Sequence, residues 1–134
     1  MVYNAEHAIA ATCKQLGCEV ANYTAAPVYA GDNSRGCHQW LVEFSHRPAS
    51  LDEFASVLDK NLQTENSDYQ AKRSGNIFLD PPMITEAPVG LFDKWLASTG
   101  KLGGQRKVPR LCPDRRYIDP MLEACAAMKN TKQL

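Results

Sequence analysis

The pattern of hydrophobic and polar positions predicts two elements with little ambiguity. Residues 51–65 carry apolar side chains on one helical stripe behind the capping-box sequence Ser50-Leu51-Asp52-Glu53, which predicts an amphipathic helix. Residues 39–44 alternate, with Trp40, Val42 and Phe44 on one face and Gln39, Leu41 and Glu43 on the other. This period of two is typical of a strand with a buried aromatic side.

Residues that cap or end helices and strands divide the rest of the chain into further elements. Asn4 is a candidate cap for an N-terminal helix that Gly17 closes, and the extended run 18–29 should end or bend at Pro27. Ser67 is a candidate cap for a short helix over 68–73. The remaining expectations are a strand at 83–87, a helix from Leu91 that stops at Gly100, and a last helix over 114–128 that Pro120 either kinks or restarts with Asp119 as its cap.

Strands interleaved with helices predict an α/β (α+β) fold. We expect a small mixed sheet of three to four strands flanked by helices, in two to three layers. A length of 134 residues fits one domain, residues 1–134, with a substantial core. The side chains expected to share one core are Trp40, Phe44, Phe54, Leu58, Phe92, Trp95 and Leu122.

The amino-acid composition argues against several functional classes for this chain. The 15 basic and 15 acidic residues balance, which argues against a bulk nucleic-acid binder or a polybasic membrane surface. Apolar runs are too short to cross a bilayer and the N-terminus does not resemble a signal peptide, so we expect a cytoplasmic protein with no membrane partner. The five cysteines, irregularly spaced, favour reduced thiols over a disulfide framework, and neither they nor the three histidines predict a metal site.

Positive charge gathers in one segment. Between residues 101 and 116 the only acidic residue is Asp114, and three glycines lie within Gly100–Gly104. The cations of this segment are Lys101, Arg106, Lys107, Arg110, Arg115 and Arg116. Glycine allows close approach of the backbone to a ligand, and clustered cations suit phosphate, although a solvated surface loop has the same composition. The segment matches neither a P-loop nor G-x-G-x-x-G.

Other titratable residues predict little chemistry. The histidines His7, His38 and His46 are far apart in the sequence, and there is no G-x-S-x-G turn for a nucleophilic serine. Glu43 and Glu86 fall in the middle of strands, where we expect each side chain to face solvent or to pair with an arginine. The aromatic residues Trp40, Tyr69, Phe92 and Trp95 are expected in the core rather than at a ligand.

Three runs together resemble a known family: Cys37–Phe44 (CHQWLVEF), Asn66–Arg73 (NSDYQAKR) and Gly100–Leu111 (GKLGGQRKVPRL). In order and spacing they resemble the C-terminal domain of the auxin-responsive-promoter family of acyl acid amido synthetases, of bacterial type, within the acyl-adenylate-forming superfamily. The resemblance implies a small sheet flanked by helices. It also implies a ligase that uses ATP to adenylate a carboxylic acid and transfers the acyl group to an amine such as an amino acid.

The resemblance also implies roles for individual residues. The C-terminal domain of that family closes over an N-terminal domain that binds ATP, its Mg and the acyl acid, so Lys107 would face the nucleotide phosphates as the catalytic cation. Gly103, Gly104, Gln105 and Arg110 would shape the nucleotide-binding loop. The chain would then be the mobile C-terminal lid domain, with the adenylation domain absent, and inactive by itself.

The sequence also fits two other hypotheses for the function. One is a stand-alone module that binds phosphate or nucleic acid through the basic segment 101–116, although only Tyr117 adjoins the cations, whereas single-strand binders interleave cations with stacking aromatics. The other is an interaction domain without a ligand.

Overall fold

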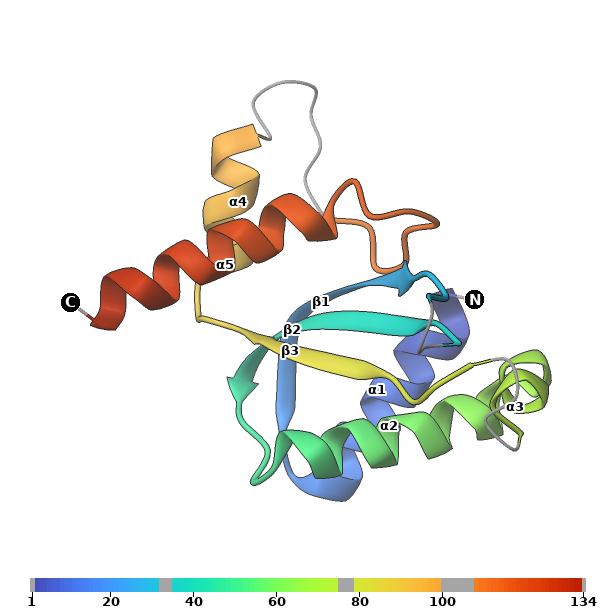
Figure 1. Ribbon diagram of the computed structural model, residues 1–134. Coiled ribbons are helices and arrows are strands. Elements are labelled where there is room, and N and C mark those ends of the chain that lie inside the picture. The colour runs from blue at the N-terminus through green and yellow to red at the C-terminus, as the bar shows by residue number, and fades with distance from the viewer. Residues whose placement is uncertain (1, 32–34, 75–78, 100–107, 134) are drawn as a thin grey trace.

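A computed structural model describes residues 2–31, 35–74, 79–99 and 108–133 (Figure 1). Within these ranges the elements in chain order are α1 (Val2–Leu16), β1 (Glu19–Val28), β2 (Cys37–His46), α2 (Leu51–Glu65), α3 (Ser67–Arg73), β3 (Met83–Ala87), α4 (Leu91–Thr99) and α5 (Ile118–Gln133). The predicted helix at 51–65 and strand at 83–87 are confirmed at both of their ends.

The three strands form one mixed sheet in the order β1-β2-β3. The long strands β1 and β2 pair antiparallel, with Ala25 opposite Trp40, and β3 pairs parallel to β2, with Ile84 opposite Trp40. A parallel neighbour requires a crossover connection, which α2 and α3 supply. The α/β class and the small mixed sheet flanked by helices are therefore confirmed, with three strands.

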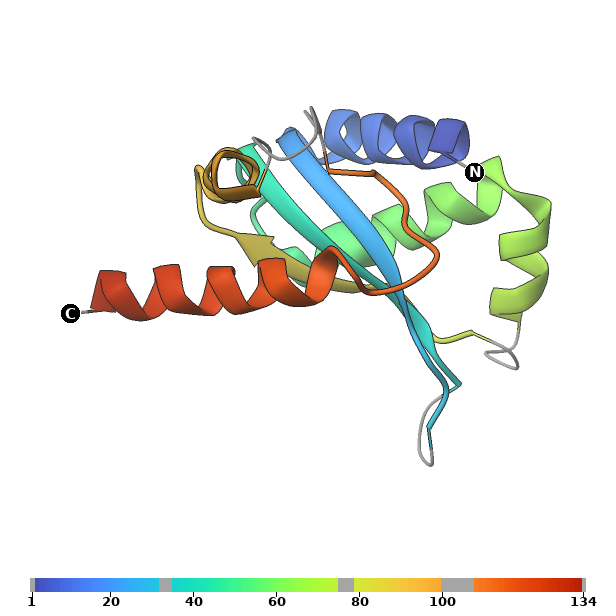
Figure 2. The ribbon, with the colours of Figure 1, turned by 90° about the horizontal axis from the view of Figure 1, so that it is seen from above.

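Helices cover both faces of the sheet, so the domain has three layers (Figures 1 and 2). On one face α1, α2 and α3 pack on Tyr23, Trp40, Val42 and Phe44. On the other, α4 and α5 pack on Ala26, Leu41 and Ala87. Successive side chains of a strand point to opposite faces, so β2 supplies both layers from adjacent positions.

The expectation of one shared core is therefore wrong, because the sheet divides the apolar residues into two clusters. Trp40, Phe44, Phe54 and Leu58 lie in the cluster with α1 and α2. Phe92 belongs to the second cluster, where Trp95 and Leu122 are partly buried. The apolar periodicity of a helix shows which side of the helix is buried, but it does not show which face of the sheet the helix covers.

Four local details differ from the sequence expectations. Asn66 caps α3 in place of Ser67, and its side-chain oxygen accepts from Tyr69 N at 2.9 Å. Helix α1 begins before Asn4, whose side-chain amide donates instead to Glu65 O at the end of α2 (2.9 Å). Strand β1 continues through Pro27 to Val28, which is possible because β1 is an edge strand and need not donate at every position. Helix α5 begins at Ile118, so Pro120 falls in its first turn, where the missing N–H would have no partner in the helix.

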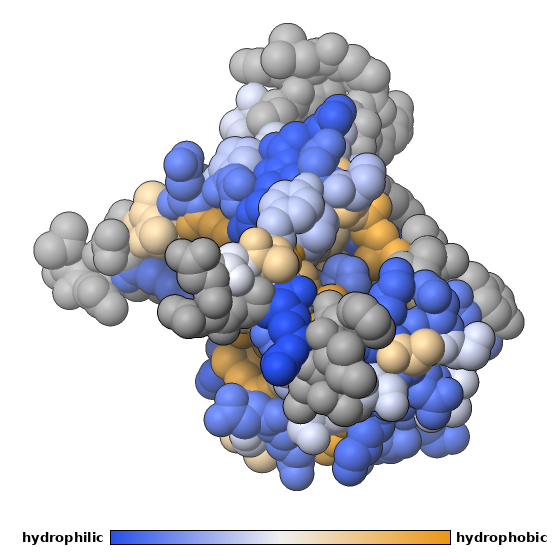
Figure 3. Space-filling view, turned by 45° about the vertical axis from the view of Figure 1, so that its right-hand side comes forward, coloured by the Kyte–Doolittle hydropathy of each residue, from blue (hydrophilic) through white to orange (hydrophobic). Residues whose placement is uncertain are grey.

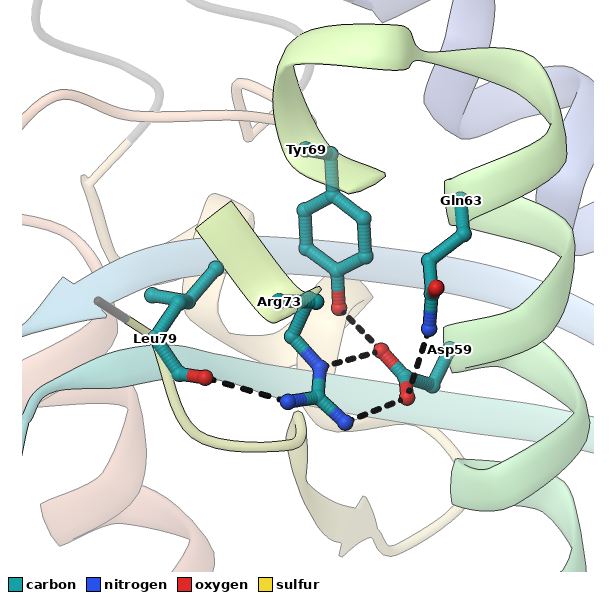
Figure 4. Close-up of polar contacts among 5 residues, drawn as sticks. All are labelled: Asp59, Gln63, Tyr69, Arg73 and Leu79. Atoms are coloured by element: carbon teal, nitrogen blue, oxygen red, sulfur yellow. Dashed lines mark hydrogen bonds and ion pairs between the residues drawn. The ribbon is translucent and has the colours of Figure 1, made fainter. Parts of the chain in front are cut away.

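A buried polar network joins α2 to α3 (Figure 4). The Asp59 carboxylate accepts two bonds from the Arg73 guanidinium, both 2.8 Å, and one from the Tyr69 hydroxyl at 2.6 Å. Gln63 donates to the same carboxylate, and Arg73 also donates to Leu79 O at 3.0 Å. The run Asn66–Arg73 thus fixes the turn between two helices and the approach to β3.

The network also sets the ionisation of Asp59. Burial by itself would raise the pKa of this carboxyl, but the bonds from Arg73, Tyr69 and Gln63 outweigh it and hold the pKa below the usual 3.8. A pKa that is lower in the folded chain means that the unfolded chain binds more protons in acid. The stabilisation is therefore present above about pH 3.8 and is lost as the pH falls through the folded pKa.

The surface that Figure 3 displays is mostly hydrophilic, with smaller hydrophobic patches between. In the part of the chain that the structure covers, no helix is both long enough and apolar enough to span a bilayer.

We predict that Phe54→Ala destabilises the domain by about 3–5 kcal/mol, because it opens a cavity around a fully buried ring. The Phe54 ring meets Phe44 edge-on at 5.1 Å between centroids, a contact that alanine cannot make. Urea unfolding measures the loss, with Ser56→Ala on the exposed side of α2 as the control. A loss below 1 kcal/mol would contradict the packing of α2 on the sheet.

We predict that Asp59→Asn costs about 3 kcal/mol at pH 7, because it leaves the Arg73 guanidinium buried without its counter-charge. In the unmodified chain, the free energy of unfolding should fall between pH 5 and pH 2.5, and this fall should be smaller in Asp59→Asn. Urea titrations at the two pH values measure both effects. An unchanged pH dependence would show that Asp59 is not the group that titrates.

Candidate functional site

The basic segment that the sequence singled out lies between α4 and α5. Of the residues assigned to a nucleotide site, Gly103, Gly104, Gln105 and Lys107 lie outside the described residues, and Arg110 lies within them. The structure describes the elements that precede the segment and the last part of the segment itself, residues 108–116. These two parts determine how the segment is attached to the domain.

Residues 108–112 run alongside the free edge of β1. Ala25 N donates to Arg110 O at 2.9 Å, Cys112 N donates to Ala25 O at 3.0 Å, and Ala25 forms a parallel bridge with Leu111. The Thr24 hydroxyl adds a bond to Pro109 O at 2.7 Å. This short run acts as an additional strand at the sheet edge, so the backbone directly after Lys107 is held by three hydrogen bonds.

Val108 strengthens this attachment. Its side chain is buried in the cluster beneath α4 and α5, next in sequence to Lys107. Burial of a valine side chain stabilises by about 1.5–3 kcal/mol. The sequence Val108-Pro109 therefore combines an apolar anchor with a residue of fixed φ at the point where the basic segment rejoins the sheet.

Arg110 is held by β1 and α1. Its guanidinium carbon lies 4.7 Å from the centre of the Tyr23 ring, and its Nε lies 3.4 Å from Glu6 Oε1. The Tyr23 hydroxyl donates to the same Glu6 oxygen at 2.7 Å. Burial raises the pKa of Tyr23, and the bond to Glu6 raises it further. The arrangement gives Arg110 two partners within the domain, which suits the positioning of the loop.

Arg115 connects the same region to three elements. It donates to Pro27 O on β1 at 3.0 Å, to Gln39 Oε1 on β2 at 2.8 Å, and to Asp119 on α5 at 2.9 Å. Arg116 pairs with Asp114 at 2.9 Å, and this bond lowers the pKa of the Asp114 carboxyl. Of the six cations of the basic segment, the three that the structure describes are each paired with a carboxylate.

The entry to the segment is fixed by Glu43. This buried carboxylate lies on the face of β2 that α4 covers, and it accepts from Gly90 N at 3.3 Å and from Phe92 N at 3.2 Å. A carboxylate at a helix N-terminus satisfies unpaired amides and complements the helix dipole. Sequence reasoning assigned Glu43 to solvent or to an arginine and missed this role. The one signal available was a charged residue within residues 40–44, where the other four side chains are apolar.

Several other residues considered for chemistry have structural partners. Glu86 binds Arg47 through two bonds, one of 2.9 Å, which agrees with the expected arginine pair. His38 packs against Tyr69 with 6.3 Å between ring centres. Among the described residues, no group of three or more His, Cys, Asp or Glu is arranged to hold a metal ion. All five cysteines are free thiols.

A protein-family model and solved structures match this chain. The model of the GH3 family C-terminal domain matches residues 3–116. No curated protein matches the sequence at a significant level.

Among solved structures, a GH3.15 acyl acid amido synthetase superposes with a TM-score of 0.66 at 15% identity, covering 95% of this chain and 22% of that one. A second, AtGH3.15 acyl acid amido synthetase in complex with 2,4-DB, gives a TM-score of 0.64 at 16% identity, covering 92% of this chain and 23% of that one.

These structural likenesses show a shared fold, and the chain spans less than a quarter of the length of either structure. The family match covers the run Asn66–Arg73, the anchored residues 108–112 and the whole basic segment between α4 and Arg116. The resemblance found in the sequence to acyl acid amido synthetases agrees with it, whereas the bacterial type stays a prediction. The chain belongs to the GH3 family, as its C-terminal domain.

Proposed function

We propose that this chain is the C-terminal domain of an ATP-dependent acyl acid amido synthetase. In this proposal the domain closes over a separate adenylation domain, which binds ATP, Mg and the carboxylic acid. The acyl group then passes from the adenylate to an amine, such as that of an amino acid. The observation that carries the proposal is the family match over residues 3–116, which contains the whole segment around Lys107.

The catalytic role in this proposal belongs to Lys107. Adenylate formation concentrates negative charge on the α-phosphate and on the departing pyrophosphate, and a positioned ammonium stabilises that charge. A cation that arrives only on closure acts mainly in the reacting state, which is the condition for raising the rate of the chemical step. Gly103, Gly104 and Gln105 are proposed to shape the loop on which Lys107 is presented.

The attachment of the segment supports this proposal. A loop that delivers a charge to a phosphate needs a fixed origin, because an error of about 1 Å in placement costs about a hundredfold in rate. The bonds of residues 109–112 to Thr24 and Ala25 supply that origin directly after Lys107. Arg110 is proposed to act from this origin, as a positioning residue braced by Glu6 and Tyr23.

The alternative, a stand-alone phosphate- or nucleic-acid-binding module, has less support. It requires the cations of residues 101–116 to be available to a ligand. Arg110, Arg115 and Arg116 instead form ion pairs with Glu6, Asp119 and Asp114. These three carboxylates neutralise the described cations of the segment.

We predict that the 134-residue chain alone does not catalyse exchange between ATP and pyrophosphate. The domain supplies one wall of the proposed site, and the walls that would exclude water belong to the adenylation domain. A radiolabelled pyrophosphate exchange assay tests this, with the chain rejoined to an adenylation domain as the positive control. Exchange by the chain alone would contradict the proposal that the adenylation domain is needed to complete the site.

We predict that Lys107→Ala, in an enzyme that contains both domains, lowers the rate of acyl-adenylate formation by about a hundredfold or more. Affinity for the acyl acid should hardly change, because the contact is made in the closed, reacting state. Lys107→Arg should restore little activity, since a planar guanidinium does not reproduce a compact ammonium. Pre-steady-state measurement of adenylate formation separates the two effects.

The matched control is Lys60→Ala, which removes an exposed cation from α2, on the face of the sheet opposite α4. It should leave the adenylation rate unchanged. An adenylation rate in Lys107→Ala equal to that of the unmodified enzyme would show that the basic segment is structural.

A further inference from the structure

Two cysteines are brought together where α1 ends. The helix stops at Leu16, and Gly17 follows with a φ of 67°, in the left-handed region that favours glycine. Cys18 N then donates to Cys13 O at 3.1 Å. A bond that spans five residues across a left-handed glycine defines the Schellman motif, and the two residues that it joins commonly pack their side chains together.

The backbone places Cys13 and Cys18 within the range of a disulfide. Residues joined by the same kind of bond within a helix have Cα atoms about 6 Å apart. Disulfides join Cα atoms separated by about 4.4–6.8 Å. Both side chains also belong to the cluster between α1, α2 and the sheet, and they share a hydrogen bond. The two sulfurs therefore lie on the same side of the backbone.

The two thiols differ in access and in reactivity. Cys18 is 4% exposed, whereas Cys13 is only half-buried. Burial, assisted by the neighbouring Cys13, raises the pKa of the Cys18 thiol to about 12. A thiol reacts as its thiolate, so Cys18 is a slow nucleophile that a reagent in solution hardly reaches. Cys13 is therefore the first of the two to react.

Cys112 provides a comparison within the same chain. It is half-buried, as Cys13 is, but its thiol donates to Asp114 Oδ1 at 3.5 Å. A reagent that reaches Cys13 should also reach Cys112. The difference lies in the second thiol, which the Schellman motif supplies to Cys13.

From this geometry we propose that Cys13 and Cys18 form a reversible oxidation site, which a low-molecular-weight disulfide such as glutathione disulfide closes. The Cys13 thiolate attacks one sulfur of the reagent, forms a mixed disulfide and releases one glutathione thiolate. The Cys18 thiolate then attacks the Cys13 sulfur, forms the protein disulfide and releases the second glutathione thiolate. The chain loses two electrons and two protons, and both pass to the two glutathione molecules.

Closure of this disulfide ties the last turn of α1 to the residue that precedes β1. Hydrogen bonds at Asn4 and Thr12 already join α1 to α2. By linkage, the factor by which the fold favours the disulfide is also the factor by which the disulfide favours the fold. The oxidised chain should therefore unfold at a higher temperature than the reduced chain. The inference does not rest on the proposed amide synthesis.

Equilibration of the 134-residue chain with glutathione buffers tests the proposal. The ratio of disulfide to dithiol gives the effective concentration of the thiol pair, and the same measurement in concentrated urea supplies the value for the unfolded chain. This baseline is needed because two cysteines so close in sequence also meet when the chain is unfolded. We expect the folded chain to exceed it by at least about tenfold, because the Schellman bond holds the two residues together.

Trypsin locates the bond. Lys14 lies between the two cysteines and the next cleavage site is Arg35, so peptides 1–14 and 15–35 contain one cysteine each. Oxidation should join these two peptides, and reduction should separate them. Cys112 should be found as a free thiol or as a mixed disulfide with glutathione.

Cys18→Ala is the test variant, because it removes the second thiol and should stop the reaction at the mixed disulfide on Cys13. Cys112→Ala is the matched control and should leave the joined peptides unchanged. If Cys18→Ala fails to fold, the equilibrium and the peptide map of the unmodified chain still decide. The proposal is overturned if peptides 1–14 and 15–35 are not joined in the folded chain, or if folding does not raise the effective concentration of the pair.

Discussion

Burial of β2 on both faces is the constraint on which the rest of the domain depends. This central strand pairs with both neighbours, and its adjacent residues Leu41 and Val42 are each fully buried in different clusters. In this chain the first two helices, α1 and α2, cover one face, and the last two, α4 and α5, cover the other (Figure 2).

The same strand determines how the basic segment is attached. Glu43 on β2 holds the start of α4, and Gln39 on β2 accepts from Arg115 near the end of the segment. The edge of β1 then fixes residues 109–112 through Thr24 and Ala25. The segment that contains Lys107 is thus connected on both sides to one sheet, as the role proposed for this lysine would require.

The motif Asn66–Arg73 shows that a run typical of a family can be structural. Asn66 caps α3, and Tyr69 and Arg73 bind Asp59 on α2 (Figure 4). Substitution of Tyr69 or Arg73 should therefore lower the stability of the helix pair.

The sequence by itself determined the local elements and the family. The capping box and apolar stripe of residues 51–65, the strand at 83–87 and the alternation around Trp40 are encoded within a few residues, because helix and strand periods depend on near neighbours. The tertiary structure decided the rest. It divided the apolar residues into two cores, and it placed Glu43 at α4 and Arg110 over Tyr23. Glu43 and Phe92 are 49 positions apart, and their juxtaposition arises from strand order and from which face a helix covers, neither of which a local pattern contains.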